Sequence, residues 1–198
     1  MWIARALLIA SLPLAGCSGG RGPDKTDPGV RKAFAALAAL KPVAPTDGRD
    51  ANGRLMFSIG KLTGTLPPGW SAIRLVGQTT YRSEDFQETM RVLGYRSDAP
   101  LDGAQKKDVL VALAELSRRG ESVLGAFGPK IDLSRPVVES TTWGTSARFT
   151  ATGPLTRLGF HYVAAGANEA LMLQLDGNSE ADSPAHAAAV IQSIRRLE

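Results

Sequence analysis

The chain has 198 residues, of which 43% are hydrophobic, and its 23 Lys and Arg against 19 Asp and Glu give a formal net charge of +4. Basic and acidic residues are mixed along the chain, and no basic block is interleaved with aromatics, which excludes a nucleic-acid-binding surface. Cys17 is the only cysteine, which excludes an internal disulfide and a cysteine metal cluster. The length suits one domain.

The first seventeen residues have the pattern of an export signal. Arg5 precedes an apolar run over residues 6–14, and this run is too short to span a bilayer of about 30 Å. A core helix is the alternative, but Pro13 interrupts the run. We therefore expect residues 1–16 to be a signal peptide that is removed.

The segment Leu14-Ala15-Gly16-Cys17 resembles the lipobox of bacterial lipoproteins. The resemblance implies a diacylglycerol on the Cys17 sulfur, cleavage before Cys17 and acylation of the new amino terminus. Two or three acyl chains make attachment to the membrane permanent in practice, since each buried methylene contributes about 0.8 kcal/mol. Ser18, at the position after the cysteine, implies delivery to the outer membrane, facing the periplasm. Residues 17–27 are expected to be a lipidated flexible tether, because Gly and polar residues fill them.

The remaining residues, 28–198, are expected to form a single α/β domain with its core in residues 54–198. Asp27 as the cap and Pro28 at the first helical position predict a helix over residues 28–41. Apolar residues follow at helical spacing, which predicts that one face of this helix packs on the domain. Residues 42–52 are polar and contain proline, and predict a connection.

Strand signals begin after this connection. Apolar and polar residues alternate over 55–59, which is typical of a strand. A turn at residues 66–69 (Leu-Pro-Pro-Gly) is followed by a second predicted strand over 70–76. Residues 79–82 and 88–95 are predicted to form a hairpin.

The clearest internal helix begins at Asp102. Gln105 stands three residues later, which is the spacing of a capping box, with Asp where Ser or Thr is commoner. An apolar stripe follows, and Gly120 is predicted to end the helix in the left-handed conformation. Residues 121–135 are predicted to be a loop.

Four strands are predicted next, over residues 137–143, 146–152, 156–165 and 170–175. Their connections are too short for parallel crossovers, so they predict an antiparallel meander.

A last helix closes the predicted order of elements. Ser183 is expected to cap it, with Pro184 at the first helical position. Its expected buried stripe is Val190, Ile191, Ile194 and Leu197.

These elements predict an α+β fold, with an antiparallel sheet of about seven or eight strands and helices packed on its faces. Three segments resemble the PsbP-like α/β/α sandwich: the strand entry at 66–70, the hairpin around 81–85, and the closing strand 171–175 with the helix after it. The resemblance covers residues 54–197. It implies a noncatalytic accessory or binding protein, and it carries over no ligand-binding residue.

The search for catalytic and metal-binding motifs gives no site. The two histidines, His161 and His186, lack a second ligand at metal spacing, so no metal or other cofactor is expected. His161 is expected to be structural. Residues 144–148 lack the final glycine of a nucleophile elbow, and residues 120–126 have Ala where a phosphate loop requires Lys. No catalytic residue is therefore expected.

Large aromatics remain as binding candidates. Trp70 and Trp143 are expected first in the core and second at a binding surface. The expected function is that of a lipid-anchored, noncatalytic cell-envelope binding or accessory lipoprotein that acts on an unidentified protein partner. One version is an immunity lipoprotein that neutralises a toxin.

The competing class is an envelope hydrolase with a dispersed active site. A pocket that holds His161 with a Ser and a carboxylate within hydrogen-bond reach would favour the enzyme. A packed interior with one exposed apolar patch would favour binding.

Overall fold

The computed structural model describes residues 27–75, 78–126, 131–141, 143–153, 157–178 and 182–197. The expected signal peptide (1–16) and Cys17 lie outside the described residues, as does the tether up to residue 26. Among the helices that the structure describes, none is long and apolar enough to cross a membrane.

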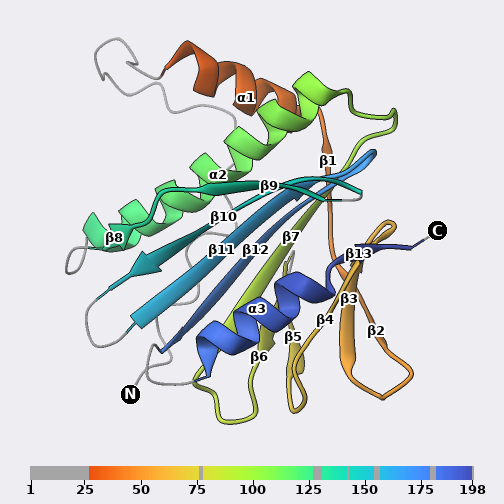
Figure 1. The fold of residues 1–198 in the computed structure, drawn as a ribbon, viewed down its shortest axis with the longest axis vertical. Helices are drawn as coiled ribbons and strands as arrows, with labels where there is room; N and C mark the ends of the chain where they lie inside the picture. Colours follow the sequence, from red (N-terminus) through yellow and green to blue (C-terminus); the bar gives the residue numbers. More distant parts are fainter. Residues whose placement is uncertain are drawn as a thin grey trace.

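The described residues form three helices and two antiparallel sheets (Figure 1). The helices are α1 (Pro28–Ala38), α2 (Gly103–Ala126) and α3 (Ser183–Ser193). The larger sheet has nine strands, in the order β5 (Ser71–Leu75), β6 (Gln78–Arg82), β7 (Thr89–Arg96), β12 (Glu169–Asn178), β11 (Arg157–Ala165), β10 (Gly144–Thr152) and β8 (Asp132–Leu133), with β1 (Lys41–Val43) paired to β7 and β9 (Val137–Thr141) paired to β10. The smaller sheet has the order β13 (Arg195–Arg196), β4 (Leu62–Thr65), β3 (Leu55–Ile59) and β2 (Thr46–Arg49).

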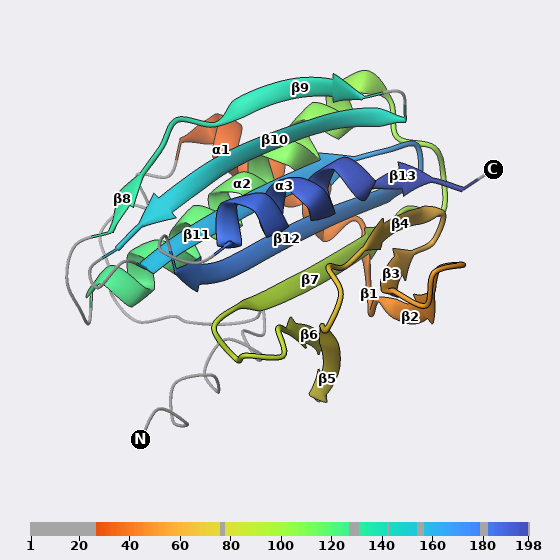
Figure 2. The same cartoon turned by 60° about the horizontal axis from the view of Figure 1, so that its bottom comes forward.

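The predicted fold class is confirmed, and the larger sheet exceeds the expected seven or eight strands. Figures 1 and 2 show α1 and α2 on one face of this sheet and α3 on the other. Helix α2 packs on β10, β11 and β12, and α1 packs on α2. Helix α3 packs on β4, β11 and β12.

Two apolar clusters fill the space on either side of the nine-stranded sheet. The cluster under α3 joins the helix, the large sheet and the small sheet, and its largest members include Phe57, Tyr81 and Leu173. The cluster under α1 and α2 includes Leu37 and Leu113. The two sheets approach closely at Gly94 of β7, where an added Cβ would lie 2.8 Å from Cδ1 of Ile59.

The first helix begins as predicted but ends early. The Asp27 carboxylate accepts a hydrogen bond of 2.7 Å from the Gly29 N–H, which caps α1. The helix ends at Ala38 instead of continuing to residue 41, because Lys41–Val43 pairs with β7. The predicted connection over 42–52 is wrong for the same physical reason: distant strands β7 and β3 supply backbone partners for β1 and β2.

The strands over 55–59, 70–76, 79–82 and 88–95 are confirmed as β3, β5, β6 and β7, with β6 and β7 paired as a hairpin. The strand β4, over 62–65, has no counterpart in the prediction. It contains only one large apolar residue and is held by pairing with β3 and β13.

The capping box of α2 is confirmed. The Asp102 N–H donates to Oε1 of Gln105 at 2.9 Å, and the Gln105 N–H donates to Oδ1 of Asp102 at 2.8 Å. The predicted end at Gly120 is wrong, since the helix continues to Ala126. The predicted loop over 121–135 therefore contains the last turns of α2 and the strand β8.

The antiparallel meander is confirmed as β9, β10, β11 and β12. In α3 the cap differs from the prediction: Asp182 is the N-cap residue, and Ser183 is fully buried inside the first turn. Leu197 is also mispredicted. It is 45% exposed, because the helix ends at Ser193 and the chain then pairs with β4 as β13.

A chain of hydrogen bonds, buried at Tyr81 and exposed at Arg74, links the small sheet to the large one. The hydroxyl of Tyr81, on β6, donates to Oδ1 of Asp47, on β2, at 2.7 Å. The other oxygen of Asp47 accepts a hydrogen bond of 3.0 Å from the guanidinium of Arg74, on β5. Burial, and then the hydrogen bond to Asp47, raise the pKa of Tyr81 well above its usual value.

The raised pKa of Tyr81 predicts a loss of stability at alkaline pH. The unfolded tyrosine releases its proton near pH 10, whereas the folded one keeps it, so the free energy of unfolding falls above that pH by about 1.4 kcal/mol per pH unit from this group. Tyr81→Phe is expected to cost about 1.5 kcal/mol at pH 8. Urea unfolding at pH 8, 10 and 11 should show that the difference in free energy of unfolding between the unmodified protein and Tyr81→Phe decreases as the pH rises. The other buried tyrosines are common to both proteins. A difference that stays constant would contradict a raised pKa at Tyr81.

Candidate binding groove

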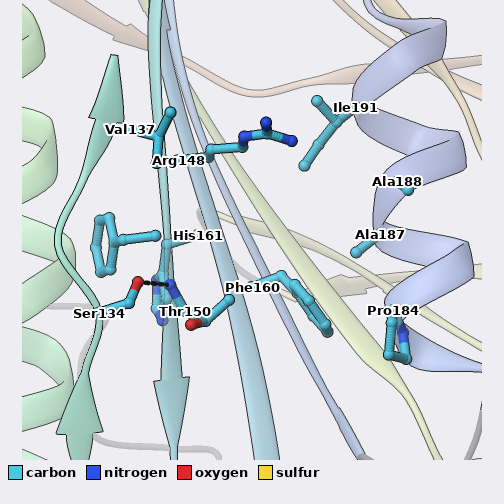
Figure 3. Close-up of a pocket in the computed structure, with 11 residues that line it drawn as sticks. Ser134, Val137, Arg148, Thr150, Phe160, His161, Pro184, Ala187, Ala188 and Ile191 are labelled. Carbon is cyan, nitrogen blue, oxygen red and sulfur yellow. Dashed lines mark hydrogen bonds between the residues drawn. The ribbon is translucent and has the colours of Figure 1, made fainter.

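An open groove lies between α3 and the outer part of the nine-stranded sheet (Figure 3). Its volume is about 340 Å³. The walls are mainly apolar, and one cation is present. The lining residues are Ser134, Val137, Arg148, Phe149, Thr150, Phe160, His161, Pro184, Ala187, Ala188 and Ile191.

The groove exists because α3 covers only part of its face of the sheet. Helix α3 packs on β11 and β12, whereas the β10 residues on the same face have no helix over them in the described structure. Strand alternation turns Arg148 and Thr150 toward this face, because they pair with Tyr162 and Phe160. On the helix side, Ala187 and Ala188 are too small to close the space.

A bulge in the edge strand shapes the outer rim. Leu133 of β8 pairs with Ala151, and Val137 of β9 pairs with Arg148, so three residues on the edge stand opposite two on β10. Within the bulge, Ser134 donates its N–H to the Thr150 carbonyl and accepts the Thr150 N–H on its side-chain oxygen, both at 2.9 Å. The bulge thus places Ser134 in the groove.

The groove carries one cation near its rim. Arg148 donates to Oε1 of Glu139 at 2.8 Å, and the two side chains are 53% and 44% exposed. An ion pair as exposed as this contributes less than about 1 kcal/mol. A carboxylate from another molecule can therefore replace Glu139 at small cost.

An exposed apolar residue continues the groove onto the edge strand. Val137 is 49% exposed and pairs with Arg148 on the groove face, whereas Val138, 66% exposed, pairs with Ala147 and points to the opposite face. They belong to the few large hydrophobic side chains on the surface of the described residues. Two adjacent valines on a sheet edge are typical of an interaction surface.

His161 is among the lining residues, but its side chain points to the opposite face of the sheet, under α2. It shares a strand face with Val163, which packs under α2, and its Nδ1 lies 2.5 Å from the hydroxyl of Ser117 on α2. Its ring stacks on Phe149 at a centroid distance of 4.6 Å. Asp176 is near, since a Cβ on Gly159 would lie 3.2 Å from Nε2 of His161 and 3.4 Å from Oδ1 of Asp176.

This group has the composition of a catalytic triad but not its accessibility. His161 is 1% exposed and Ser117 is 3% exposed, under helix α2. A nucleophile must meet its substrate, and here packing closes the hydroxyl off. The group is a buried polar network that fastens α2 to the sheet.

The other residues named from the sequence lie outside the groove. Trp70 lies in the core and is 7% exposed. Its ring contacts the His186 ring edge-on, with a distance of 6.3 Å between the ring centroids. His186 in turn bonds Oε2 of the buried Glu88 at 2.6 Å. Trp143 is half-buried and packs against the same core. Cys17 lies outside the described residues.

The sequence does not mark the groove residues Val137, Arg148 and Ile191 as a group. They come from β9, β10 and α3, and no local pattern joins them. The one available signal is the pair Val137-Val138 beside a proline, at the start of a predicted strand.

Among the residues that the structure describes, no three His, Cys, Asp or Glu side chains gather where they could hold a metal ion. The groove itself presents apolar surface and one guanidinium, that of Arg148.

No protein-family model and no curated protein sequence matches the chain. Solved structures do match. The cyanobacterial PsbP protein CyanoP of Synechocystis sp. PCC 6803 has a TM-score of 0.52 at 13% identity, over 93% of this chain and 99% of that one. LpqN of Mycobacterium tuberculosis, involved in cell envelope biogenesis, has a TM-score of 0.46 at 12% identity, over 80% and 92% of the two chains. The Saccharomyces cerevisiae Ran-binding protein Mog1p has a TM-score of 0.43 at 11% identity, over 78% and 96%.

The likeness to CyanoP confirms the PsbP-like fold expected from the sequence. At this identity the likeness concerns the fold alone.

The buried position of Ser117 gives a test of whether it is structural. Ser117→Ala is expected to lower the free energy of unfolding by about 1–3 kcal/mol, because it leaves a buried ring nitrogen of His161 without this hydrogen bond. Ser140→Ala, on the exposed strand β9, is the control and should change it by less than about 0.5 kcal/mol. A serine-directed fluorophosphonate should not label Ser117 in the folded protein, and labelling there would contradict the structural role.

Proposed function

We propose that this protein is a lipid-anchored, noncatalytic protein of the cell envelope that binds a protein partner through the groove between α3 and β10. The observation that carries the proposal is the groove itself, open to solvent and lined by Val137, Phe160 and Ile191. Binding sites are typically concave, mostly apolar and equipped with a few polar groups.

The groove favours a partner with a protruding apolar side chain. Such a side chain gains about 25 cal/mol for each Å² of apolar surface removed from water, and it also covers Val137. Arg148 favours an acidic group next to that side chain, since the exposed Glu139 is its present partner. The chemistry thus fits an apolar residue with a carboxylate nearby.

Two features support the absence of catalysis and the anchoring. The Ser117 hydroxyl, which is hydrogen-bonded to His161, is buried between α2 and the sheet and is 3% exposed. The leader with Leu14-Ala15-Gly16-Cys17 supports acylation at Cys17, and ten tether residues would hold the domain within about 18 Å of the membrane on average. The groove would then work close to the bilayer.

Photo-crosslinking tests the groove. A photoreactive amino acid at Val137, in cells that make the protein, should give an adduct with one envelope protein. Ala188→Trp fills the groove from its exposed helix side and should reduce the adduct at least tenfold. Ala189→Trp, also exposed on α3 but not in the groove, is the matched control and should leave the yield unchanged.

The outcome that would contradict groove binding is an adduct whose yield is insensitive to Ala188→Trp, or equally sensitive to Ala189→Trp. A photoreactive group at Val111, on the exposed side of α2, serves as a second control and should not give the same adduct.

Metabolic labelling tests the anchor. In cells fed with labelled palmitate, the protein should carry the label and sediment with the membranes, since its acyl chains make attachment permanent. Cys17→Ser removes the sulfur and should abolish the label and the lipobox cleavage. Native protein that begins at the initiator Met with an unmodified Cys17 would rule out the anchor.

A further inference from the structure

Two arginines lie side by side on the face of the large sheet opposite the groove. Arg91 of β7 pairs with Thr80 of β6, and Arg82 stands two residues further along β6 on the same face. Residues in this diagonal relation are about 7–8 Å apart at the backbone, so two long guanidinium side chains can converge. Met90 and Tyr81, their neighbours in sequence, point into the core on the other face.

Neither guanidinium has an acceptor for its Nε. Both Nε atoms are buried without a hydrogen-bond partner, and neither arginine forms an ion pair with a carboxylate within the described part of the chain. Burying a charged donor without an acceptor is costly. On strand β12, Gln174 stands opposite Arg91 and Asp176 stands opposite Thr89, and the Gln174 amide donates to Asp176. The cost is removed when an anion occupies the space between the two arginines.

The neighbouring loop holds one arginine in place. The Cζ atom of Arg82 lies 3.8 Å from the centroid of the Phe86 ring, a cation–π contact. Phe86 has a φ of 63°, in the left-handed region, and its side chain is 64% exposed. A left-handed conformation is strained for a bulky residue and clusters at ligand sites.

Helix α2 packs on β10, β11 and β12, so its cover ends before β6. Figure 2 shows β5 and β6 beyond the helices, at the far side of β7. Among the described helices, none lies over this part of the face.

We propose that Arg82 and Arg91 form a phosphate-binding site next to Phe86. The two guanidiniums bring two positive charges and paired N–H donors, which match the oxygens and the nearly doubled negative charge of a phosphate monoester. A carboxylate carries a single charge and therefore neutralises only one of the two. The phosphate can come from free phosphate or from a lipid headgroup, beside which the exposed ring of Phe86 would contact the interface. The site is independent of the groove, since it lies on the other face.

Binding of labelled inorganic phosphate tests the site. The full chain, purified in a nonionic detergent, is measured by equilibrium dialysis at constant ionic strength. Arg82→Gln and Arg91→Gln should each weaken binding at least tenfold, whereas Arg96→Gln, an exposed arginine on the same strand β7, should leave it unchanged. Phosphate should also raise the Tm of the unmodified protein, and chloride at equal ionic strength should not.

The source of the phosphate is distinguished by competition. Dihexanoyl phosphatidic acid and unlabelled phosphate are compared as competitors of the labelled phosphate. If the lipid competes at a concentration at least tenfold lower than phosphate, the ligand is a lipid headgroup. If both compete at equal concentration, the ligand is free phosphate. Circular dichroism checks that each variant is folded. A second variant, Arg91→Lys, keeps the positive charge but lacks the planar guanidinium with its paired donors. Arg91→Lys should weaken phosphate binding at least threefold. Undetectable binding, or equal weakening by Arg96→Gln, would overturn the proposal.

Discussion

The structure depends on a single constraint: a large antiparallel sheet with two apolar faces, each of which must be covered. Helices α1 and α2 cover one face, and α3 with the small sheet covers the other. The chain offers only eleven residues in α3, too few to cover every strand on that side. The groove is the part of the apolar face left over, and it is therefore a direct consequence of how the sheet is covered.

The same constraint separates polar groups by accessibility. Between α2 and the sheet, Ser117 and His161 are buried and hydrogen-bonded to each other, and this hydrogen bond stabilises the packing of the helix. Beyond the reach of α2, Arg82 and Arg91 hold guanidinium nitrogens without acceptors. The sheet thus places a satisfied polar pair where a helix lies and an unsatisfied pair where none does. The pair Ser117–His161 therefore has a structural role, and the proposed binding role belongs to Arg82 and Arg91.

Local signals in the sequence identified most elements because each depends on neighbours along the chain. Asp27 and Asp102 accept hydrogen bonds from backbone groups two and three residues away, so both helix starts could be recognised. Alternation over 55–59 likewise reports the two faces of one strand. The predictions were wrong where residues distant in the sequence determine the structure. Residues 41–43 form a strand because they pair with β7. Helix α2 continues past Gly120 despite the local stop signal.

The candidate sites could be predicted least. Val137, Arg148 and Ile191 are far apart in the sequence, and they meet only through the β9–β10 register and the position of α3. Trp70, one of the two tryptophans considered as binding candidates, is in the core because a large aromatic surface is most stable away from water.

By itself the sequence determined the α+β class, the meander and the starts of α1 and α2, since periodicity and capping are short-range properties. It also contains the contiguous segment ending at Cys17 that resembles a lipobox. Only the tertiary structure decided which face each helix covers, where the groove opens and that Arg82 and Arg91 are neighbours. Those outcomes follow from strand register and packing between residues distant in the chain, and no local pattern encodes them.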